Sequence, residues 1–136
     1  MPIKLVIDTT ARTKKNHQVI RYRWSNRNGV RKKVPFIAQN DVYKQYEDYC
    51  LWRLKEQYKG ETIDYKVNVK SLYYMPTHRK IDLTNLHAAL HDILVKAKIL
   101  EDDNCKIIVS TDGSRVLYDH NNPRTEVYIE KIESEV

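Results

Sequence analysis

The clearest structural signal in the sequence is the stretch Asp82–Ala97, which reads DLTNLHAALHDILVKA. Leu86, Leu90 and Ile93 recur at steps of three and four residues, the spacing that places side chains on one face of a helix. Asp82 falls at the start of this pattern, where a carboxylate is favoured by the helix dipole and can cap free amide groups. The stretch therefore predicts a helix with one buried face.

A second helix is predicted earlier in the chain, from about Asp41 to Tyr58. Asn40 can cap it, and Gly60 is suited to ending it. Apolar residues follow at helical spacing between these two signals: Val42, Tyr46, Tyr49, Cys50 and Leu54.

Alternating apolar residues predict extended segments in the rest of the chain. A long strand from Ile63 to Tyr74 changes phase near Ser71, which suggests a bulge. Asn28-Gly29 is a strong hairpin signal, because both residues tolerate positive φ. Further strands are expected at Ile3–Ile7, Val19–Trp24, Val30–Ile37, Cys105–Val109 and Val127–Ile132, with turns at Asp112–Ser114 and Asn121–Pro123.

The length of 136 residues fits one domain, residues 1–136, since single domains cluster near this size. We expect an α+β fold in which a mixed β-sheet packs against two main helices. A basic loop and ribbon, about residues 9–38, precedes the first helix.

Composition excludes several classes of protein. With 41% hydrophobic and 31% charged residues the chain is too polar for a membrane span, and Met1–Thr10 lacks the apolar run of a signal peptide. A cytoplasmic protein is expected. Cys50 and Cys105 lack the paired spacing of zinc or redox sites, so both are interpreted as reduced, half-buried packing residues. Three glycines cannot build a phosphate-binding loop, so no nucleotide cofactor is expected.

The net charge of +6 is concentrated in the first forty residues, where Asp8 is the sole carboxylate. Solubilising surfaces usually mix both signs, whereas this segment predicts contact with a polyanion such as DNA. Tyr22 and Trp24 are set among its arginines. The cations are Lys4, Arg12, Lys14, Lys15, Arg21, Arg23, Arg27, Arg31, Lys32 and Lys33.

Glu101, Asp102 and Asp103 form an acidic run after the second helix. Such a run is either a solvated loop or a site for a hard cation such as Mg²⁺ or Mn²⁺. A helix from Leu83 to about Ala97 rises about 22 Å, and an extended chain from Lys98 to Asp103 returns about 20 Å. We therefore expect that Asp103 can approach Asp82 within one chain, although helix capping alone also explains Asp82.

These motifs resemble the RusA family of Holliday junction resolvases. The family pattern opens a helix with Asp-Leu-Asp-Asn-Leu, continues through an Asp-containing middle and ends on an Asp-Asp pair. Here it appears as Asp82–Leu86, then Asp92, then Asp102-Asp103. The basic Lys14-Lys15-Asn16 is similar to the family's Asn-containing loop.

The resemblance implies a homodimer that uses a divalent metal, Mg²⁺ or Mn²⁺, to cut four-way junctions. It matches Asp82 and Asp103 to the family's catalytic, metal-binding carboxylates. Thr84 would be a weaker, neutral metal ligand, so the site must draw charge from Asp102 or Glu101 or bind the metal less tightly. Thr84 replaces the family's second Asp, and Ala88 replaces a functional Lys of many members. The expected DNA-binding residues are Lys14, Lys15, Asn16, Arg21, Arg23, Arg31, Lys32, Lys33, Arg79 and Lys80.

Other readings remain open at this level. A chain with Thr84 and Ala88 could bind branched DNA without cutting it, and Tyr22, Trp24 and Tyr43 could stack on single-stranded DNA or RNA. His87 and His91 are one helical turn apart, a spacing that suits a metal but is more typical of a polar helix face. An ion pair between Asp112 and Arg115 is expected to close their turn.

Overall fold

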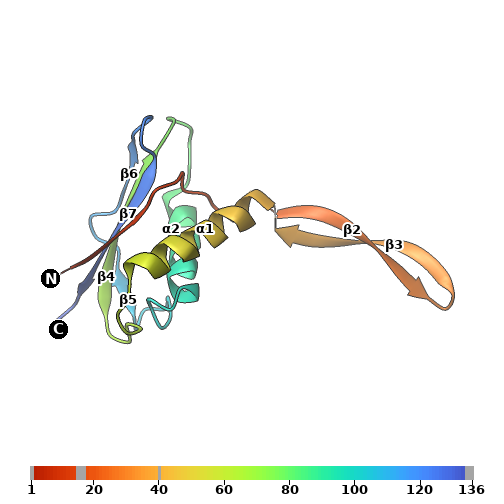
Figure 1. Ribbon diagram of the computed structural model, residues 1–136, viewed down its shortest axis with the longest axis horizontal. Coiled ribbons are helices and arrows are strands. Elements are labelled where there is room, and N and C mark those ends of the chain that lie inside the picture. Colours follow the sequence, from red (N-terminus) through yellow and green to blue (C-terminus); the bar gives the residue numbers. More distant parts are fainter. Residues whose placement is uncertain (1, 15–17, 40, 134–136) are drawn as a thin grey trace.

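The computed structural model describes residues 2–14, 18–39 and 41–133, without the side chains of residues 18–20 and 37–39. Figure 1 shows a sheet, two helices against it and a long ribbon that leaves them. The elements in chain order are β1 (Ile3–Ile7), β2 (Gln18–Arg27), β3 (Val30–Gln39), α1 (Asp41–Gln57), β4 (Val67–Met75), α2 (Leu83–Lys96), β5 (Ile108–Ser110), β6 (Arg115–Tyr118) and β7 (Arg124–Lys131).

The main sheet is mixed, as predicted. Its strands lie in the order β1-β7-β4-β5, and β6 also pairs with β4. β7 runs antiparallel to both β1 and β4, whereas β5 and β6 run parallel to β4. β5 pairs with the start of β4 and β6 with its end, so the two short strands follow one another along the same edge. β6 is a strand that the sequence patterns did not predict.

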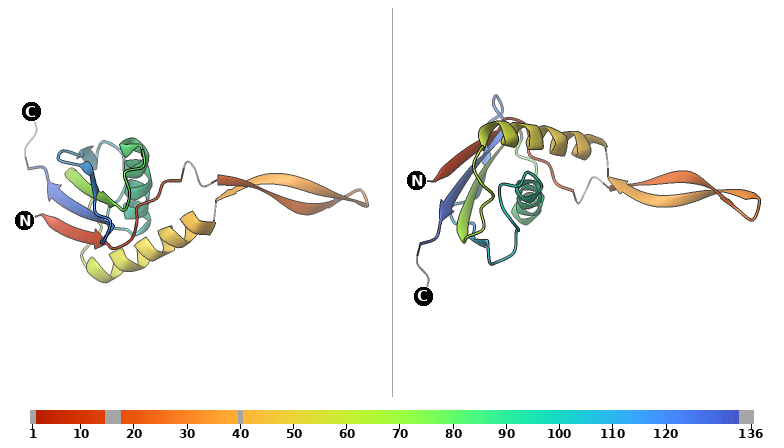
Figure 2. Two further views of the ribbon diagram at one scale, coloured as in Figure 1. Left: turned by 90° about the horizontal axis from the view of Figure 1, so that it is seen from above. Right: turned by 60° about the horizontal axis from the view of Figure 1, so that its bottom comes forward.

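Both helices cover the same face of this sheet (Figure 2). The core between the layers is built from the apolar stripe of α2 and from the inward residues of the central strands. Leu86, Leu90 and Ile93 are each at most 2% exposed, and so are Val67 and Val69 on β4. The fold is therefore α+β, with α1 and α2 placed close to where the sequence predicted them.

The predicted bulge near Ser71 is wrong. Side chains on β4 alternate without interruption from Val67 to Tyr73, and Ser71 itself points inward and is fully buried. A small polar residue on the inward face made the apolar pattern look shifted. The irregularity of β4 lies instead between Val67 and Asn68, opposite β5.

Two smaller expectations also need correction. Cys50 is fully buried on α1, but Cys105 is exposed in the turn before β5 rather than half-buried on a strand. Among the described residues Asp112 makes no ion pair with Arg115, which lies in β6. The turn is held by Asn68, whose Oδ1 accepts from Asp112 N at 2.8 Å and whose Nδ2 donates to Asp112 O at 3.2 Å.

β2 and β3 form a separate antiparallel ribbon that extends away from the sheet and helices in every view (Figures 1 and 2). The predicted Asn28-Gly29 turn is confirmed, with φ of 54° at Asn28 and 74° at Gly29. Asn40, the expected cap of α1, lies outside the described residues. No helix within the described ranges is both long enough and apolar enough to cross a membrane.

Candidate active site

Asp82 is the N-cap of α2, as its position in the sequence predicts. Its backbone is extended, with φ −87° and ψ 118°, and its Oδ1 accepts from the amide of Thr84 at 2.9 Å. The first amide groups of a helix lack intrahelical acceptors, so this bond stabilises the start of α2. A carboxylate has a second oxygen, so capping through Oδ1 is compatible with binding a ligand. Asp82 is exposed to solvent.

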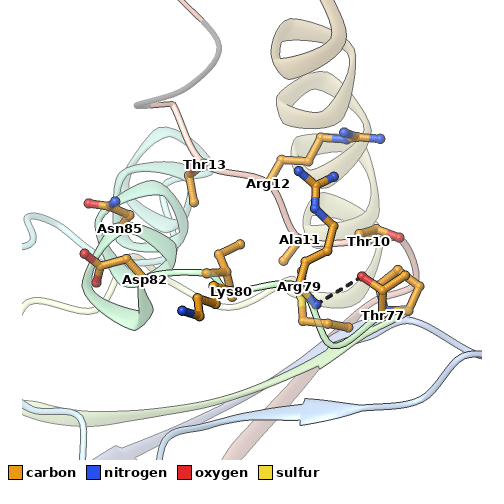
Figure 3. A pocket seen from close by; sticks show the side chains of 12 residues that line it. Thr10, Ala11, Arg12, Thr13, Thr77, Arg79, Lys80, Asp82 and Asn85 are labelled. Atoms are coloured by element: carbon orange, nitrogen blue, oxygen red, sulfur yellow. Dashed lines mark hydrogen bonds between the residues drawn. The ribbon is translucent and has the colours of Figure 1, made fainter.

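A cavity of about 560 Å³ opens beside this helix start. In Figure 3, Asp82 and Asn85 project from α2 on one side, and Arg12 and Arg79 lie on the other side with Lys80 between. Among the described residues, the lining thus combines three cations with a single carboxylate and an amide. Its lining residues are Thr10, Ala11, Arg12, Thr13, Met75, Pro76, Thr77, Arg79, Lys80, Ile81, Asp82 and Asn85.

Asn85 and Arg12, two polar residues of this lining, were not predicted as site residues from the sequence. Asn85 follows Asp82 by three positions, which places both on one side of the first helical turn. That spacing was visible in the motif and could have identified Asn85. Arg12 comes from the loop after β1, which contacts α2 only through tertiary packing. Local sequence patterns hold no signal for that contact.

The loop that carries Arg12 is fixed to the helices. Ala11 and Thr13 are buried, and Lys14 Nζ donates to Asp92 Oδ2 on α2. Burial raises the pKa of Asp92, but hydrogen bonds from Lys14 and Lys96 outweigh this, so the pKa lies below its usual range. Lys14, predicted to bind DNA, is therefore engaged by a carboxylate of its own chain.

The acidic run lies at the other end of α2. Asp102 is occupied with its own turn, because Oδ1 accepts from Asp103 N at 2.7 Å and Oδ2 from the Asn104 side chain at 3.0 Å. Glu101 N donates to Ile63 O at 2.9 Å, which ties the run to the segment between α1 and β4. Glu101, Asp102 and Asp103 are all exposed.

The expected approach of Asp103 to Asp82 within one chain is therefore wrong. Lys98 adopts a left-handed conformation, with φ of 62°, and turns the chain away at the end of α2. Ile99 and Leu100 are then buried in the core, and Leu100 bridges to Ile63. The chain after α2 runs across the end of the helix, so about 21 Å of helix separates its two ends.

The described residues do not form a preassembled metal site. No group of three or more His, Cys, Asp or Glu side chains among them is arranged to hold an ion. Thr84 is exposed and does not line the cavity, so Asp82 and Asn85 are the side chains of the α2 start that could offer oxygen ligands there. Mg²⁺ often uses one or two carboxylates together with phosphate oxygens of the substrate, which is the donor set that fits here.

His87 and His91 are packed rather than displayed on a polar helix face. Their rings stack at 5.3 Å, and His87 Nδ1 shares a hydrogen bond of 2.8 Å with the hydroxyl of Tyr73. Burial lowers the pKa of His91 to about 4, helped by the neighbouring His87. His91 is therefore neutral at physiological pH, and the pair is a partly buried part of the helix face rather than a fully exposed one.

The remaining predicted DNA-binding residues line the cavity, lie on the ribbon or fall outside the described residues. Arg79 and Lys80 line the cavity. Most of the others lie on the ribbon, which contains no carboxylate between residues 18 and 39. Lys15 and Asn16 lie outside the described residues. The ribbon residues are Arg21, Arg23, Arg31, Lys32 and Lys33.

Fold and cavity define a small α+β protein with a cationic site around one helix-capping carboxylate. The chain belongs to the RusA family, because the family model for endodeoxyribonuclease RusA matches residues 9–130. It is 36% identical, over 66 residues, to the crossover junction endodeoxyribonuclease RusA of Aquifex aeolicus strain VF5. That match covers 48% of this chain and 52% of the relative, so the chain spans about half of the relative's length. The resemblance inferred from the sequence is confirmed.

Proposed function

We propose that this chain is a metal-dependent endonuclease that cuts branched DNA, with the four-way junction as substrate and a homodimer as the working form. A cytoplasmic location is also part of the proposal. Membership of the RusA family supports this proposal, and so does similarity to the Aquifex relative, a crossover junction endodeoxyribonuclease.

The observation that carries the proposal is the cationic cavity around Asp82. Arg12, Arg79 and Lys80 would bind the phosphates of a DNA strand, since cations are what a phosphate backbone requires. Asp82 and Asn85 would hold a divalent cation beside the bound phosphate. A bound Mg²⁺ or Mn²⁺ supplies an activated water and stabilises charge on the phosphate during hydrolysis. These contacts are to the backbone, so they recognise shape rather than base sequence.

A synthetic four-way junction tests the proposal directly. We expect paired nicks at symmetric positions when Mg²⁺ or Mn²⁺ is present, and intact strands when the metal is chelated. The control is a linear duplex assembled from the same strand sequences. A protein that binds the junction but leaves it intact with both metals contradicts the enzymatic proposal.

A second candidate function is branched-DNA binding without cleavage. It is favoured by the observation that Asp82 is the sole carboxylate among the described residues that line the cavity. Thr84 and Ala88 are exposed positions at which the resemblance expects Asp and Lys. The double variant Thr84→Asp, Ala88→Lys separates the two functions. If the natural chain lacks cleavage and the variant gains it, the binding function is the correct one.

A further inference from the structure

The two faces of the ribbon carry different side chains. Residues paired across an antiparallel ribbon lie on the same face, and successive residues alternate between faces. Trp24 pairs with Lys33, and Asn26 pairs with Arg31. Tyr22 lies two residues before Trp24 on the same face. We call the set Tyr22, Trp24, Arg31 and Lys33 the aromatic face.

Both rings of the aromatic face are open to solvent. Tyr22 is 59% exposed and Trp24 is 58% exposed, and the ribbon extends away from the sheet and helices (Figure 2). A cation from the opposite strand lies over each ring, with Arg31 at 4.4 Å from the ring centre of Trp24 and Lys33 at 5.3 Å from that of Tyr22. Neighbouring exposed aromatic rings with no packing role in the core indicate a binding surface.

The charge of the ribbon selects the kind of partner. Residues 18–39 hold six cations and no carboxylate, so a polyanion is the complementary partner. Duplex DNA satisfies the cations but not the rings, because its bases are stacked on each other. Unpaired nucleotides satisfy both, since a free base offers a π-face to an aromatic ring while its phosphate meets the adjacent cation.

We propose that the aromatic face binds unpaired nucleotides at the branch of a DNA substrate. Tyr22 and Trp24 stack on the bases, and Arg31 and Lys33 contact the flanking phosphates. The inference rests on the proposed function in taking branched DNA as the substrate, but it requires no cleavage. It gives the ribbon a means of distinguishing a branch with splayed bases from continuous duplex.

Tryptophan fluorescence tests the contact. The chain has two tryptophans, and Trp52 on α1 is 57% exposed, so it is a matched control for Trp24. In Trp52→Phe the signal reports on Trp24, and in Trp24→Phe it reports on Trp52. Titration with an oligo-dT strand of about twelve nucleotides, in EDTA, is expected to quench Trp24 but not Trp52. A blunt duplex of the same length should quench Trp24 much less. Equal quenching of both tryptophans, or of Trp24 by both ligands, overturns the proposal.

A pair of ribbon variants separates stacking from folding. Valine favours strands but has no π-face, so Tyr22→Val, Trp24→Val keeps the ribbon and removes the rings. We expect its oligo-dT affinity to fall between about fivefold and a hundredfold. Tyr22→Phe, Trp24→Phe should stay within about threefold of the natural chain, because the rings remain. Duplex affinity should be unchanged in both.

Three outcomes of this comparison overturn the proposal. Equal loss of oligo-dT and duplex affinity would mean that the rings only maintain the ribbon. Unchanged oligo-dT affinity would mean that they do not touch DNA. A shift from dimer to monomer in light scattering, with oligo-dT affinity retained, would mean that they contact a second copy of the chain. Since the readouts are binding and fluorescence in EDTA, failure of the nuclease proposal would leave this test unaffected.

Discussion

Asp82 caps α2, and under the proposed function it also holds the metal ion. Because Asn caps helices about as well as Asp, Asp82→Asn should leave the free energy of unfolding nearly unchanged. The same change removes the negative charge from the cavity, so junction cleavage should fall by orders of magnitude while junction binding is retained or tightened. Cleavage kinetics, binding titration and urea unfolding of the one variant measure the three quantities.

Two further variants sharpen this comparison. Asp82→Ala should also lose the cap, at a cost of about 1 kcal/mol of stability. Asp48→Asn removes an exposed carboxylate on α1, paired with Lys44, and should leave cleavage unchanged. If Asp82→Asn cleaves like the natural chain, Asp82 is a cap and nothing more.

His91 should make stability depend on pH. Its pKa is about 4 in the folded chain against an ordinary value of 6.5, so protons bind the unfolded chain more readily. The contribution of His91 to the free energy of unfolding is fully present above about pH 6.5. It is lost as the pH falls toward 4, by roughly 1–3 kcal/mol.

Urea unfolding at pH 7.5 and pH 5 measures this effect. The difference in free energy of unfolding between the two pH values should be smaller in His91→Leu. It should persist in His120→Gln, which changes an exposed histidine. The same difference in all three proteins would show that His91 is not its source.

The limits of sequence reasoning are visible in single residues. Asp82 could be placed at a helix start because capping is local, and the structure confirms it. Arg12 could not be assigned to the cavity, since its loop reaches α2 through Lys14 and Asp92, residues far apart in the sequence. Ser71 led to the wrong prediction of a bulge, because nothing in the neighbouring sequence indicates that this polar residue is buried.

Among the elements, the ribbon is expected to provide most of the duplex affinity. Replacing Arg21, Arg23 and Arg31 with Ala should weaken junction binding for all sequences and flatten its salt dependence by about one unit for each lost phosphate contact. Arg21 also pairs with Asp41 at 3.3 Å, so part of its charge is already compensated. Fluorescence anisotropy across a salt series gives the slope.

A matched variant on the body of the protein controls for net charge. Lys44, Lys55 and Lys59 are exposed cations at or near α1, and their replacement by Ala removes the same charge. This triple variant should change the salt dependence of junction binding far less than the ribbon variant does. Equal slopes for the two triple variants would place the DNA away from the ribbon.

Elements with strong periodicity were predictable, and elements defined by their partners were not. The helices and the hairpin follow from local spacing and turn chemistry. β6 has only four residues, and none of their side chains is buried. It forms because the edge of β4 offers backbone groups with which it can pair. The path of the chain after α2 is likewise decided by the burial of Ile99 and Leu100. The expectation that an extended segment folds back along α2 did not include this burial.

For the molecule as a whole, the separation of Asp82 from Asp103 bears on the assembly. If both carboxylates serve one site, they must come from two chains of a dimer. Asp82→Asn and Asp103→Asn should then each be inactive alone. Mixed dimers would hold one intact site, so an equal mixture should recover about a quarter of natural cleavage.

Subunit exchange followed by a junction cleavage assay makes the measurement, with unmixed variants as controls. A mixture as inactive as its components would contradict a shared site. An Asp103→Asn variant that cleaves normally would remove Asp103 from the site altogether, leaving Asp82 and its cavity neighbours as the whole of it.

The projecting ribbon also sets a length scale for contact with DNA. Ten residues in each strand correspond to about 33 Å, close to the 34–36 Å of one helical turn of duplex. A ribbon laid along a duplex therefore spans about ten base pairs from its base to the Asn28-Gly29 tip. The protected footprint would then extend a full turn to one side of the cut. A DNA arm shorter than one turn would end before it reached the tip of the ribbon.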